Sequence, residues 1–343
     1  MKKLLNTLFI TSEDVYLTLD GENVVGKREN QVVARFPLHT LGGIVSFSYA
    51  GASPALMGAC AERAITMSFC TPRGRFLARS SGAGNGNVLL RRAQYRVADD
   101  SASSCQIARL MIFGKVFNAR WSVERTCRDH ALRVDVEKLK AASSRLRELL
   151  PQIQSATDLE ALRGFEGVGA AVYFGVMDDL ILNRKNVFSA VGRTRRPPLD
   201  PLNALLSFSY TLLAHDCASA LESVGLDSYV GFLHRDRPGR TSLALDLMEE
   251  LRPCMADRFV LTCINNRMFD ECDFEFRESG AVLLTDTARK TFLKGWQERR
   301  SEQITHPYLS EKLEWGMVPN VQALLLARHL RGDIETYPPF LWK

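Results

Sequence analysis

The residue types best suited to chemistry are concentrated between positions 231 and 253, in the stretch GFLHRDRPGRTSLALDLMEELRP. His234 lies in its turn-rich first part, and the helix predicted from the second part carries Asp246, Glu249 and Glu250. A neutral imidazole and carboxylates form a ligand set that suits a catalytic divalent ion such as Mn²⁺ or Mg²⁺. The stretch therefore predicts a metal-dependent site. The competing interpretation is an ordinary histidine beside a solvated acidic helix face.

The helix that must position these acids is amphipathic by pattern. With about 100° between successive residues, its apolar residues share one broad face and its three acids share the other. The apolar face consists of Leu243, Ala244, Leu247, Met248 and Leu251. Glu249 lies about 60° to one side of Asp246 and Glu250 about 40° to the other, so the wheel permits any of the three to face the histidine. The Arg252-Pro253 pair is expected to end the helix.

The composition is that of an ordinary globular protein. Its 343 residues are 46% hydrophobic and 24% charged, a length that corresponds to about two domains. No segment approaches the roughly 18 to 20 apolar residues that span a bilayer, and the N-terminal sequence lacks the features of a signal peptide, so we expect a cytoplasmic protein. The eight cysteines contain no CxxC pair, which predicts reduced, mostly buried thiols without a zinc knuckle or disulfide framework.

Positive charge is unevenly distributed, although the net charge is only +5. Residues 91–133 contain nine Arg or Lys against four Asp or Glu, and residues 181–200 contain five against one. Such clusters can neutralise nucleic-acid phosphates, and a solvated basic surface is the alternative for each. The candidate phosphate contacts are Arg91, Arg92, Lys115, Arg120, Arg193, Arg195 and Arg196. The last three lie in a basic loop that ends where Asp200 and Pro201 begin a helix.

Residues 1–82 are predicted to form a small β domain with one helix. Extended segments are predicted at 15–19, 32–38, 65–70 and 76–80. The Asp20-Gly21 dipeptide predicts a hairpin-type turn after the first of them. Ser53 as a cap and Pro54 in the first turn predict a helix that reaches about residue 64.

The composition changes at 80–87, where the run SSGAGNGN offers almost no side-chain bulk for packing. We expect a glycine-rich linker at 83–90 rather than a dinucleotide-binding loop, because the glycines lack GxGxxG spacing between a strand and a helix. Beyond it, residues 91–343 show helical periodicity almost throughout and few strand signals. The predicted fold class is α+β: a small N-terminal β domain, which the family named below uses for dimerisation, joined to a larger all-α domain.

A further candidate, Glu166, lies in one of these predicted helices. Gly164, Gly167 and Gly169 surround it. Glycines reduce helix stability, so inside a helix they typically mark close packing or the close approach of a backbone or ligand. By itself this pattern does not distinguish the two.

Four motifs occur in order along the helical part: LRGFEGVGAAVYF at 162–174, NALLSFSYTLL at 203–213, GFLH at 231–234 and SLALDLMEELRP at 242–253. With the N-terminal β domain and the linker, this series resembles the CRISPR adaptation integrase, the universal CRISPR-associated endonuclease subunit that captures new spacers. The resemblance covers nearly the whole chain. The segments LDGENVV, GASPALMGACAERA and GRFLARSSGAGNGNVLLRRAQY look like the variant that accompanies type I-C systems.

The resemblance implies a set of site residues. The catalytic, metal-binding positions fall on Glu166, His234 and Glu249, with Mg²⁺ or Mn²⁺ as the ion. Asp246 falls on a neighbouring acidic position that supports these ligands, which leaves Glu250 as a solvated or ion-paired surface acid. Asn203 and Tyr210 match supporting polar positions of a neighbouring helix, for which ordinary helix packing is the alternative.

The reaction of this family joins a DNA 3′-hydroxyl to a phosphodiester of the CRISPR repeat. A divalent ion serves such a transesterification as a Lewis acid and by lowering the pKa of a bound hydroxyl or water. The resemblance also implies double-stranded and branched DNA as substrate, a homodimer, and a small ferredoxin-like CRISPR-associated partner in a heterohexamer-type complex. Two alternatives stay open: a metal-dependent repair nuclease without an integrase role, and a non-enzymatic DNA-binding scaffold.

Overall fold

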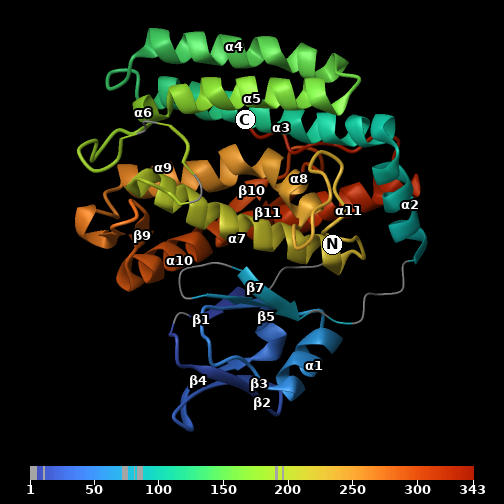
Figure 1. Ribbon diagram of the computed structural model, residues 1–343, viewed down its shortest axis with the longest axis vertical. Coiled ribbons are helices and arrows are strands. Elements are labelled where there is room, and N and C mark those ends of the chain that lie inside the picture. The colour runs from blue at the N-terminus through green and yellow to red at the C-terminus, as the bar shows by residue number, and fades with distance from the viewer. Residues whose placement is uncertain are drawn as a thin grey trace. The chain divides into compact units, whose positions relative to one another are not determined.

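The computed structural model describes residues 6–10, 12–71, 76–80, 82, 88–189, 192–194 and 197–343 (Figure 1). Contacts within the chain divide it into two compact units, Met1–Asn87 and Val88–Lys343. The division falls inside the segment 83–90 whose composition predicts a linker, and residues 83–87 of that segment lie outside the described ones.

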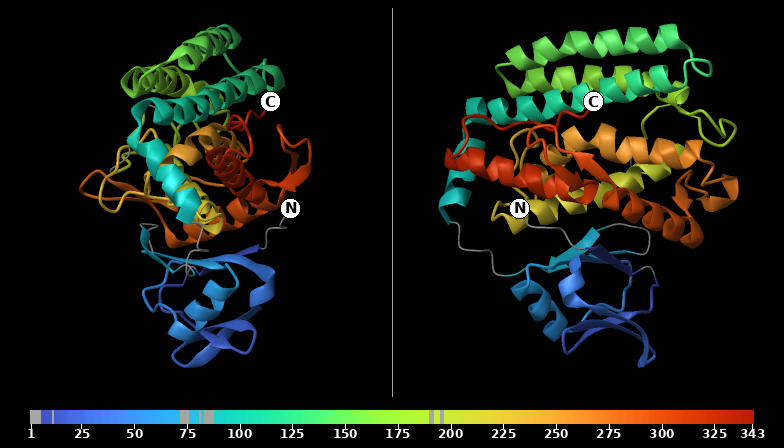
Figure 2. Two further views of the ribbon diagram at one scale, coloured as in Figure 1. Left: turned by 90° about the vertical axis from the view of Figure 1, so that its right-hand side faces the viewer. Right: turned by 180° about the vertical axis from the view of Figure 1, so that it is seen from behind.

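The described residues of the N-terminal unit form two sheets, one α-helix and a short 3-10 helix, Leu38–Thr40 (Figures 1 and 2). An antiparallel sheet consists of β2 (Tyr16–Asp20), β3 (Asn23–Arg28) and β4 (Gln31–Pro37). A mixed sheet consists, in spatial order, of β1 (Asn6–Ile10), β5 (Leu41–Ser46), β6 (Thr66–Cys70) and β7 (Phe76–Ser80). The first three of these strands are parallel and the last is antiparallel to its neighbour. The predicted turn at Asp20-Gly21 connects β2 to β3.

Helix α1 (Pro54–Glu62) begins where the sequence predicts. The Ser53 hydroxyl accepts a hydrogen bond from the Leu56 amide at 3.2 Å, and Pro54 occupies the first turn, where a helical N–H has no partner to lose. Leu56 and Cys60 of this helix pack into the core of the unit. The other buried core residues are Val15, Leu17, Val24, Leu38, Leu41, Ile44, Ile65 and Met67.

The second unit is mainly helical. Its longer helices are α2 (Val88–Asp99), α3 (Ser101–Asp129), α4 (Val136–Ser155), α5 (Leu159–Gly175), α7 (Pro201–Ser223), α10 (Asp286–Ser301) and α11 (Val318–Arg331). Its shorter helices are α6 (Met177–Leu180), α8 (Ser242–Leu251) and α9 (Arg258–Asn265). Helices α3, α4 and α5 pack side by side, and α8 lies against both α3 and α7 (Figures 1 and 2).

Aspartate side chains begin four of these helices. In each case the carboxylate accepts a hydrogen bond from the backbone amide three residues further on, which satisfies an N–H that has no partner within the helix. The capping residues are Asp100, Asp135, Asp158 and Asp200. The start of α7 at Asp200 and Pro201 is therefore as predicted.

Two short hairpins interrupt the helical unit. They pair β8 (Phe274–Phe276) with β9 (Val282–Leu284), and β10 (Gln303–Thr305) with β11 (Lys312–Glu314). Strands of three residues are too short for an alternating pattern to be recognised in the sequence. The predicted α+β class is confirmed, with a β-containing N-terminal region and a mostly helical remainder.

The helix that carries the acids does not end at Arg252-Pro253, so this prediction is wrong. It continues as a π-helix, Arg252–Asp257, directly into α9. Proline lacks the N–H for an i→i−4 hydrogen bond and clashes with the carbonyl four residues earlier, and here Pro253 lies in the first turn of the π-helix, where the regular i→i−4 pattern is interrupted.

Two compositional expectations can be compared with the structure. None of the eight cysteines forms a disulfide bond, and every one except Cys272 is buried. No helix in the described part of the chain is both long and apolar enough to cross a membrane.

Candidate active site

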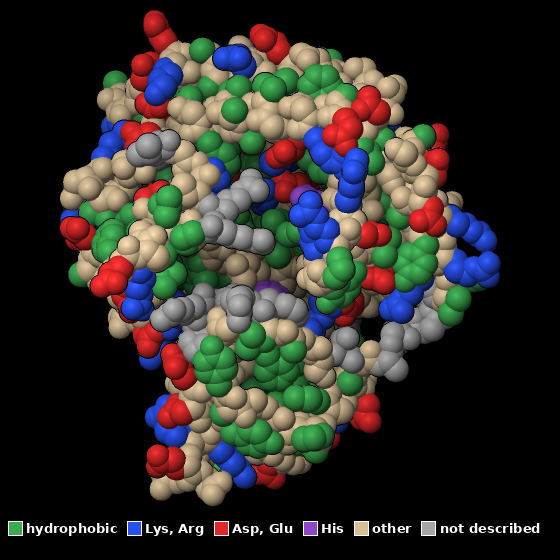
Figure 3. Space-filling view, viewed as in Figure 1, with side chains coloured by type: hydrophobic (Ala, Val, Ile, Leu, Met, Phe, Trp, Pro, Cys, Tyr) green, Lys and Arg blue, Asp and Glu red, His purple; other side chains and the backbone are tan. Residues whose placement is uncertain are grey.

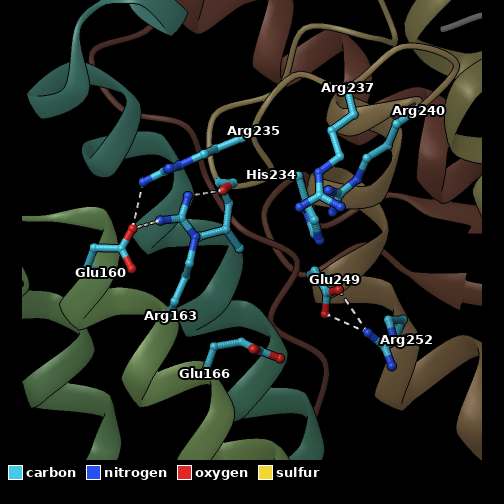
Figure 4. A pocket seen from close by; sticks show the side chains of 10 residues that line it. Glu160, Arg163, Glu166, His234, Arg235, Arg237, Arg240, Glu249 and Arg252 are labelled. Carbon is cyan, nitrogen blue, oxygen red and sulfur yellow. Dashed lines mark hydrogen bonds and ion pairs between the residues drawn. The ribbon is translucent and has the colours of Figure 1, made fainter. Parts of the chain in front are cut away.

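A pocket of about 440 Å³ in the helical unit brings the three predicted metal ligands together (Figure 4). Glu166 comes from α5, Glu249 from α8, and His234 from the segment between α7 and α8. The remaining lining residues are Glu160, Arg163, Leu233, Arg235, Arg237, Arg240 and Arg252. In Figure 3, basic side chains gather beside a hollow in which acidic side chains and a histidine are visible.

Helix α5 presents Glu166 to the pocket with 27% of its side chain exposed. Of the three glycines around it, only Gly169 packs closely, because a Cβ there would lie 3.1 Å from Val116 Cγ2 of α3. A Cβ at Gly164 or Gly167 would meet no atom within 4 Å. The close packing predicted from the glycines therefore holds for Gly169, where it brings α5 against α3.

His234 is oriented by Asp246, a fully buried residue of α8. Its Nδ1 lies 2.5 Å from Asp246 Oδ1. The backbone amides of residues 232, 233 and 234 donate to the same carboxylate at 2.6, 2.9 and 3.1 Å. Because an ionised carboxylate can only accept, Nδ1 carries the proton and Nε2 keeps its lone pair for an ion or a proton. This geometry corresponds to the supporting role expected of Asp246.

Gly231 allows the histidine segment to approach α8. A Cβ at this position would lie 2.8 Å from both Asp246 Oδ2 and Ser242 Cβ, which is closer than real Cβ atoms come to their neighbours. The hydrogen bonds from residues 232–234 to Asp246 therefore depend on glycine at 231.

The two glutamates converge on a single cation, the ammonium of Lys115 on α3. This group contacts Glu166 Oε1 and lies 2.6 Å from Glu249 Oε2. The side chains of Lys115 and Glu249 are only 10% and 7% exposed, so the interaction is largely removed from water. The basic cluster predicted Lys115 to contact DNA, but its charge lies between the two carboxylates.

Arg252 is a second cation on Glu249. Its Nη1 lies 2.8 Å from Oε1 and 3.1 Å from Oε2 of the carboxylate. Burial raises the pKa of Glu249, but the charges of Arg252 and Lys115 outweigh burial and hold this pKa well below its usual range. Glu249 is therefore ionised at neutral pH, as a metal ligand must be.

Tyr210 of α7 packs against Arg252. The guanidinium lies 4.3 Å from the centre of the Tyr210 ring, and the Tyr210 hydroxyl donates a hydrogen bond to Asp257. Burial and the Asp257 charge raise the pKa of Tyr210, so its hydroxyl stays protonated. Arg252 and Asp257 are the two ends of the π-helix, and π-helical turns occur frequently at functional sites.

Glu250 is not the surface acid that was predicted; all three acids of α8 are buried. Its carboxyl group accepts hydrogen bonds from Gln322 Nε2 and the Phe340 amide, both at 2.9 Å, and from the Tyr337 hydroxyl. Burial raises its pKa to about 7. The wheel left the role of each acid open and the family match assigned Glu250 to the surface, but residues of α11 and of the C-terminal segment cover it.

Asn203 is buried at the start of α7 and holds Arg193. Its Oδ1 accepts a hydrogen bond from Arg193 Nη1 at 2.7 Å, and its Nδ2 donates to the Gly192 carbonyl at 2.8 Å. Arg193 also donates to the Ser207 hydroxyl at 3.1 Å. Arg193, in the loop predicted to contact phosphates, is therefore bonded to side chains of α7. Arg195 and Arg196 lie outside the described residues.

The other predicted phosphate contacts differ in exposure. Arg92 is exposed, whereas Arg91 is partly buried and its Nε donates to the Gly225 carbonyl at 3.2 Å. Arg120 is 19% exposed at its side chain and lies 3.6 Å from Glu124. Among these three arginines, Arg92 has the exposure expected of a surface phosphate contact.

Four arginines that line the pocket were not selected from the sequence: Arg163, Arg235, Arg237 and Arg240. Arg163 Nη2 donates to the Leu233 carbonyl at 2.7 Å, and Glu160 pairs with both Arg163 and Arg235 at 2.6 and 2.9 Å. The signal was present in the run HRDRPGR, where three arginines directly follow His234. The charge counts over longer segments did not single out this run.

The donor set of the pocket fits a hard divalent ion in kind. Two carboxylates already converge on one cation, and the Nε2 of His234 can add a nitrogen ligand. As the side chains stand, no three His, Cys, Asp or Glu residues within the described ranges are close enough together to hold an ion. An ion held by Glu166, His234 and Glu249 would therefore require movement of these side chains.

Comparison with known proteins adds independent findings. Residues 8–298 match the model of a family described as CRISPR associated protein Cas1. The chain is 51% identical over 347 residues to CRISPR-associated endonuclease Cas1 2 of Rhodospirillum rubrum. It is 49% identical over 343 residues to CRISPR-associated endonuclease Cas1 1 of Chlorobaculum tepidum. Both alignments cover the whole of both chains.

Solved structures share the fold. A casposase bound to integration product aligns with a TM-score of 0.83 at 20% identity, covering 99% of this chain and 95% of that one. A chain of a Cas6-RT-Cas1–Cas2 complex aligns with a TM-score of 0.81 at 22% identity, covering 100% of this chain and 36% of that one. At such low identity the likeness is one of fold alone.

Proposed function

Because the chain belongs to the CRISPR-associated Cas1 family, we propose that it is a metal-dependent DNA endonuclease and integrase that inserts new spacers into a CRISPR array. The observation that carries this proposal is the convergence of Glu166, His234 and Glu249 on one pocket with arginines around it. The names of the relatives support nuclease activity. Membership of the type I-C variant stays a prediction.

The ion in this proposal is Mg²⁺ or Mn²⁺, held by Glu166, His234 and Glu249. When bound, it supplies Lewis acidity at a phosphoryl oxygen and lowers the pKa of a bound hydroxyl or water. The protein's own contribution is to prepare the ligands. Arg252 keeps Glu249 ionised and oriented, and Asp246 keeps the histidine proton on Nδ1, which leaves Nε2 free within the pocket.

The arginines around the pocket are suited to hold the DNA backbone. Arg235, Arg237 and Arg240 follow His234 in one short segment, and Arg163 lies one helical turn before Glu166. Contacts between arginine and phosphate do not depend on base sequence, and spacers differ in sequence. These side chains would position a DNA 3′-hydroxyl and the target phosphodiester beside the carboxylates.

The proposed assembly is a homodimer joined through its N-terminal units, bound to a small ferredoxin-like partner. Strand β4 is at the edge of its three-stranded sheet in the described part of the chain. Its Val32, Val33 and Phe36 side chains are 56%, 50% and 39% exposed. An edge strand with exposed apolar side chains favours association. One structural neighbour is a chain of a Cas6-RT-Cas1–Cas2 complex, which supports assembly with a further protein.

A strand-transfer assay tests the proposal. DNA with free 3′-hydroxyl ends and a plasmid containing the repeat would be incubated with the protein and Mg²⁺ or Mn²⁺. We expect covalent joining that EDTA abolishes and that Glu166→Gln abolishes. The matched control is Glu148→Gln, which changes an exposed glutamate on α4 and should leave joining intact.

The same assay separates the two alternatives. Metal-dependent cleavage of DNA without joining would favour a repair nuclease. Binding of DNA without either reaction would favour a non-enzymatic scaffold, in which the buried ion pairs of the pocket have only a structural role.

A further inference from the structure

Lys115 occupies the space in which the proposed ion would bind. Its ammonium makes contact with one oxygen of Glu166 on α5 and one oxygen of Glu249 on α8. A bound divalent ion would be held in the same way, by two carboxylates from different helices. Because both cations would need the same oxygens, the ammonium cannot stay 2.6 Å from Glu249 when an ion is ligated there.

The charges of the four directly paired groups are already balanced without an ion. The carboxylates of Glu166 and Glu249 contribute two negative charges, and Lys115 and Arg252 contribute two positive charges. A divalent ion would add two further positive charges to a cluster in which the side chains of Lys115, Glu249 and Arg252 are each no more than 10% exposed. Such an excess of buried charge is strongly unfavourable unless a cation leaves.

Lys115 is the cation that can leave. Arg252 is 8% exposed, bonds both oxygens of Glu249 and stacks on Tyr210. The lysine side chain has a flexible four-carbon stem. Beside Lys115, α3 packs closely against α8, because a Cβ on the preceding Gly114 would lie 2.9 Å from Glu250 Cβ. Rotation of the side chain therefore moves the ammonium without moving α3.

We propose that Lys115 is an internal counter-cation, which holds the carboxylates of Glu166 and Glu249 together in the absence of an ion and is displaced when the ion binds. The inference rests on the proposed metal dependence. The ion binds only those molecules in which lysine has left the site. The apparent affinity for the ion is therefore the intrinsic affinity multiplied by the fraction of molecules in which the site is free. Backbone phosphates offer the displaced ammonium a new partner, so DNA and the ion should strengthen each other's binding.

The first experiment measures Mn²⁺ affinity by electron paramagnetic resonance in the absence and presence of DNA. Lys115→Met should bind Mn²⁺ without DNA about ten- to hundredfold more tightly than the unaltered protein, as expected if lysine fills the site in most molecules. Lys115→Gln should shift the affinity in the same direction. The matched control is Lys140→Met on α4, which removes an exposed lysine paired with Glu124 and should leave the affinity unchanged.

The second experiment uses the unaltered protein. Reductive methylation followed by mass spectrometry reports the accessibility of each lysine amine. Addition of Mg²⁺ should increase the methylation of Lys115, whereas that of Lys140 should stay the same.

The outcomes are distinguishable. If Mn²⁺ binds but Lys115→Met or Lys115→Gln binds it no more tightly, or if Mg²⁺ binding leaves Lys115 protected, the lysine is not displaced and the inference is wrong. If the unaltered protein and every variant fail to bind Mn²⁺ with or without DNA, the proposed metal dependence itself fails.

Discussion

His234 and Asp246 form an imidazole–carboxylate pair, with Nδ1 and Oδ1 2.5 Å apart. Asp246→Asn preserves the size of the side chain but replaces a pure acceptor with a group that can also donate, so the histidine proton is no longer confined to Nδ1. We expect strand transfer to fall about 10- to 100-fold, the usual effect of losing a residue that orients a ligand. Circular dichroism should show a folded protein. Unchanged joining rates would contradict the orienting role.

Substitution of Glu249 should abolish activity, whereas substitution of its neighbour Glu250 should reduce stability. Glu249→Gln removes an anionic ligand at nearly constant volume, so joining at saturating Mn²⁺ should be lost. Glu250→Ala leaves the amide of Gln322, the hydroxyl of Tyr337 and the Phe340 N–H without their acceptor, which should lower the free energy of unfolding by about 2–4 kcal/mol. Urea unfolding measures this loss. An active Glu249→Gln would overturn the assignment of ligands on α8.

The stability of the helical unit should depend on pH through Glu250. Its pKa is about 7 in the folded protein and 4.5 ordinarily, so the folded state binds more protons than the unfolded state between these values. The free energy of unfolding contributed by this group must then fall as pH rises from 4.5 through 7. Urea unfolding at several pH values, compared with Glu250→Gln, isolates the effect. Parallel curves for the two proteins would show that Glu250 does not titrate in this range.

The arginines after His234 should contribute to DNA affinity without regard to sequence. Replacing Arg235, Arg237 and Arg240 by alanine should weaken binding to all duplexes alike and reduce the slope of log K against log salt by up to about three. The control is a pair of exposed arginines on α4, Arg145→Ala with Arg147→Ala. An unchanged salt slope in the triple variant would exclude these residues from the DNA interface.

The basic loop before α7 provides a related prediction. Arg195→Ala with Arg196→Ala should weaken duplex binding and reduce the salt slope by up to about two, while Mn²⁺ affinity stays the same. Arg193 is left intact in this variant because it is bonded to Asn203 and Ser207, and its removal would disturb the start of α7. A full salt slope would identify the loop as a connector.

The exposed face of β4 should mediate dimerisation. Light scattering at micromolar concentration should give twice the chain mass of 38.4 kDa. Val33→Lys with Phe36→Lys places charge on the edge strand and should produce monomers. Lys27→Glu on β3 is a control for charge alone. A monomer in the unaltered protein would contradict the proposed assembly.

Local signals in the sequence determined where several of the helices and strands lie, although β1, β3, β5 and the short strands of the helical unit were not predicted. Aspartate caps, proline in first turns and helical periodicity act within a few residues, so the starts of α1 and α7 were predicted correctly. The ordered motifs likewise selected Glu166, His234 and Glu249, which the structure brings into one pocket. The acidic helix and the histidine turn were recognised because their residues are close together in the chain.

Only the tertiary structure decided what surrounds each charge. Lys115 was predicted to contact DNA, yet its ammonium lies between Glu166 and Glu249. Glu250 was predicted to be a surface acid, yet it is buried and accepts a hydrogen bond from Tyr337. A helical wheel specifies the direction of a side chain from its own axis. The neighbouring element in that direction depends on packing between segments far apart in the chain, and this packing decides whether a charge meets water, a partner or a metal ion.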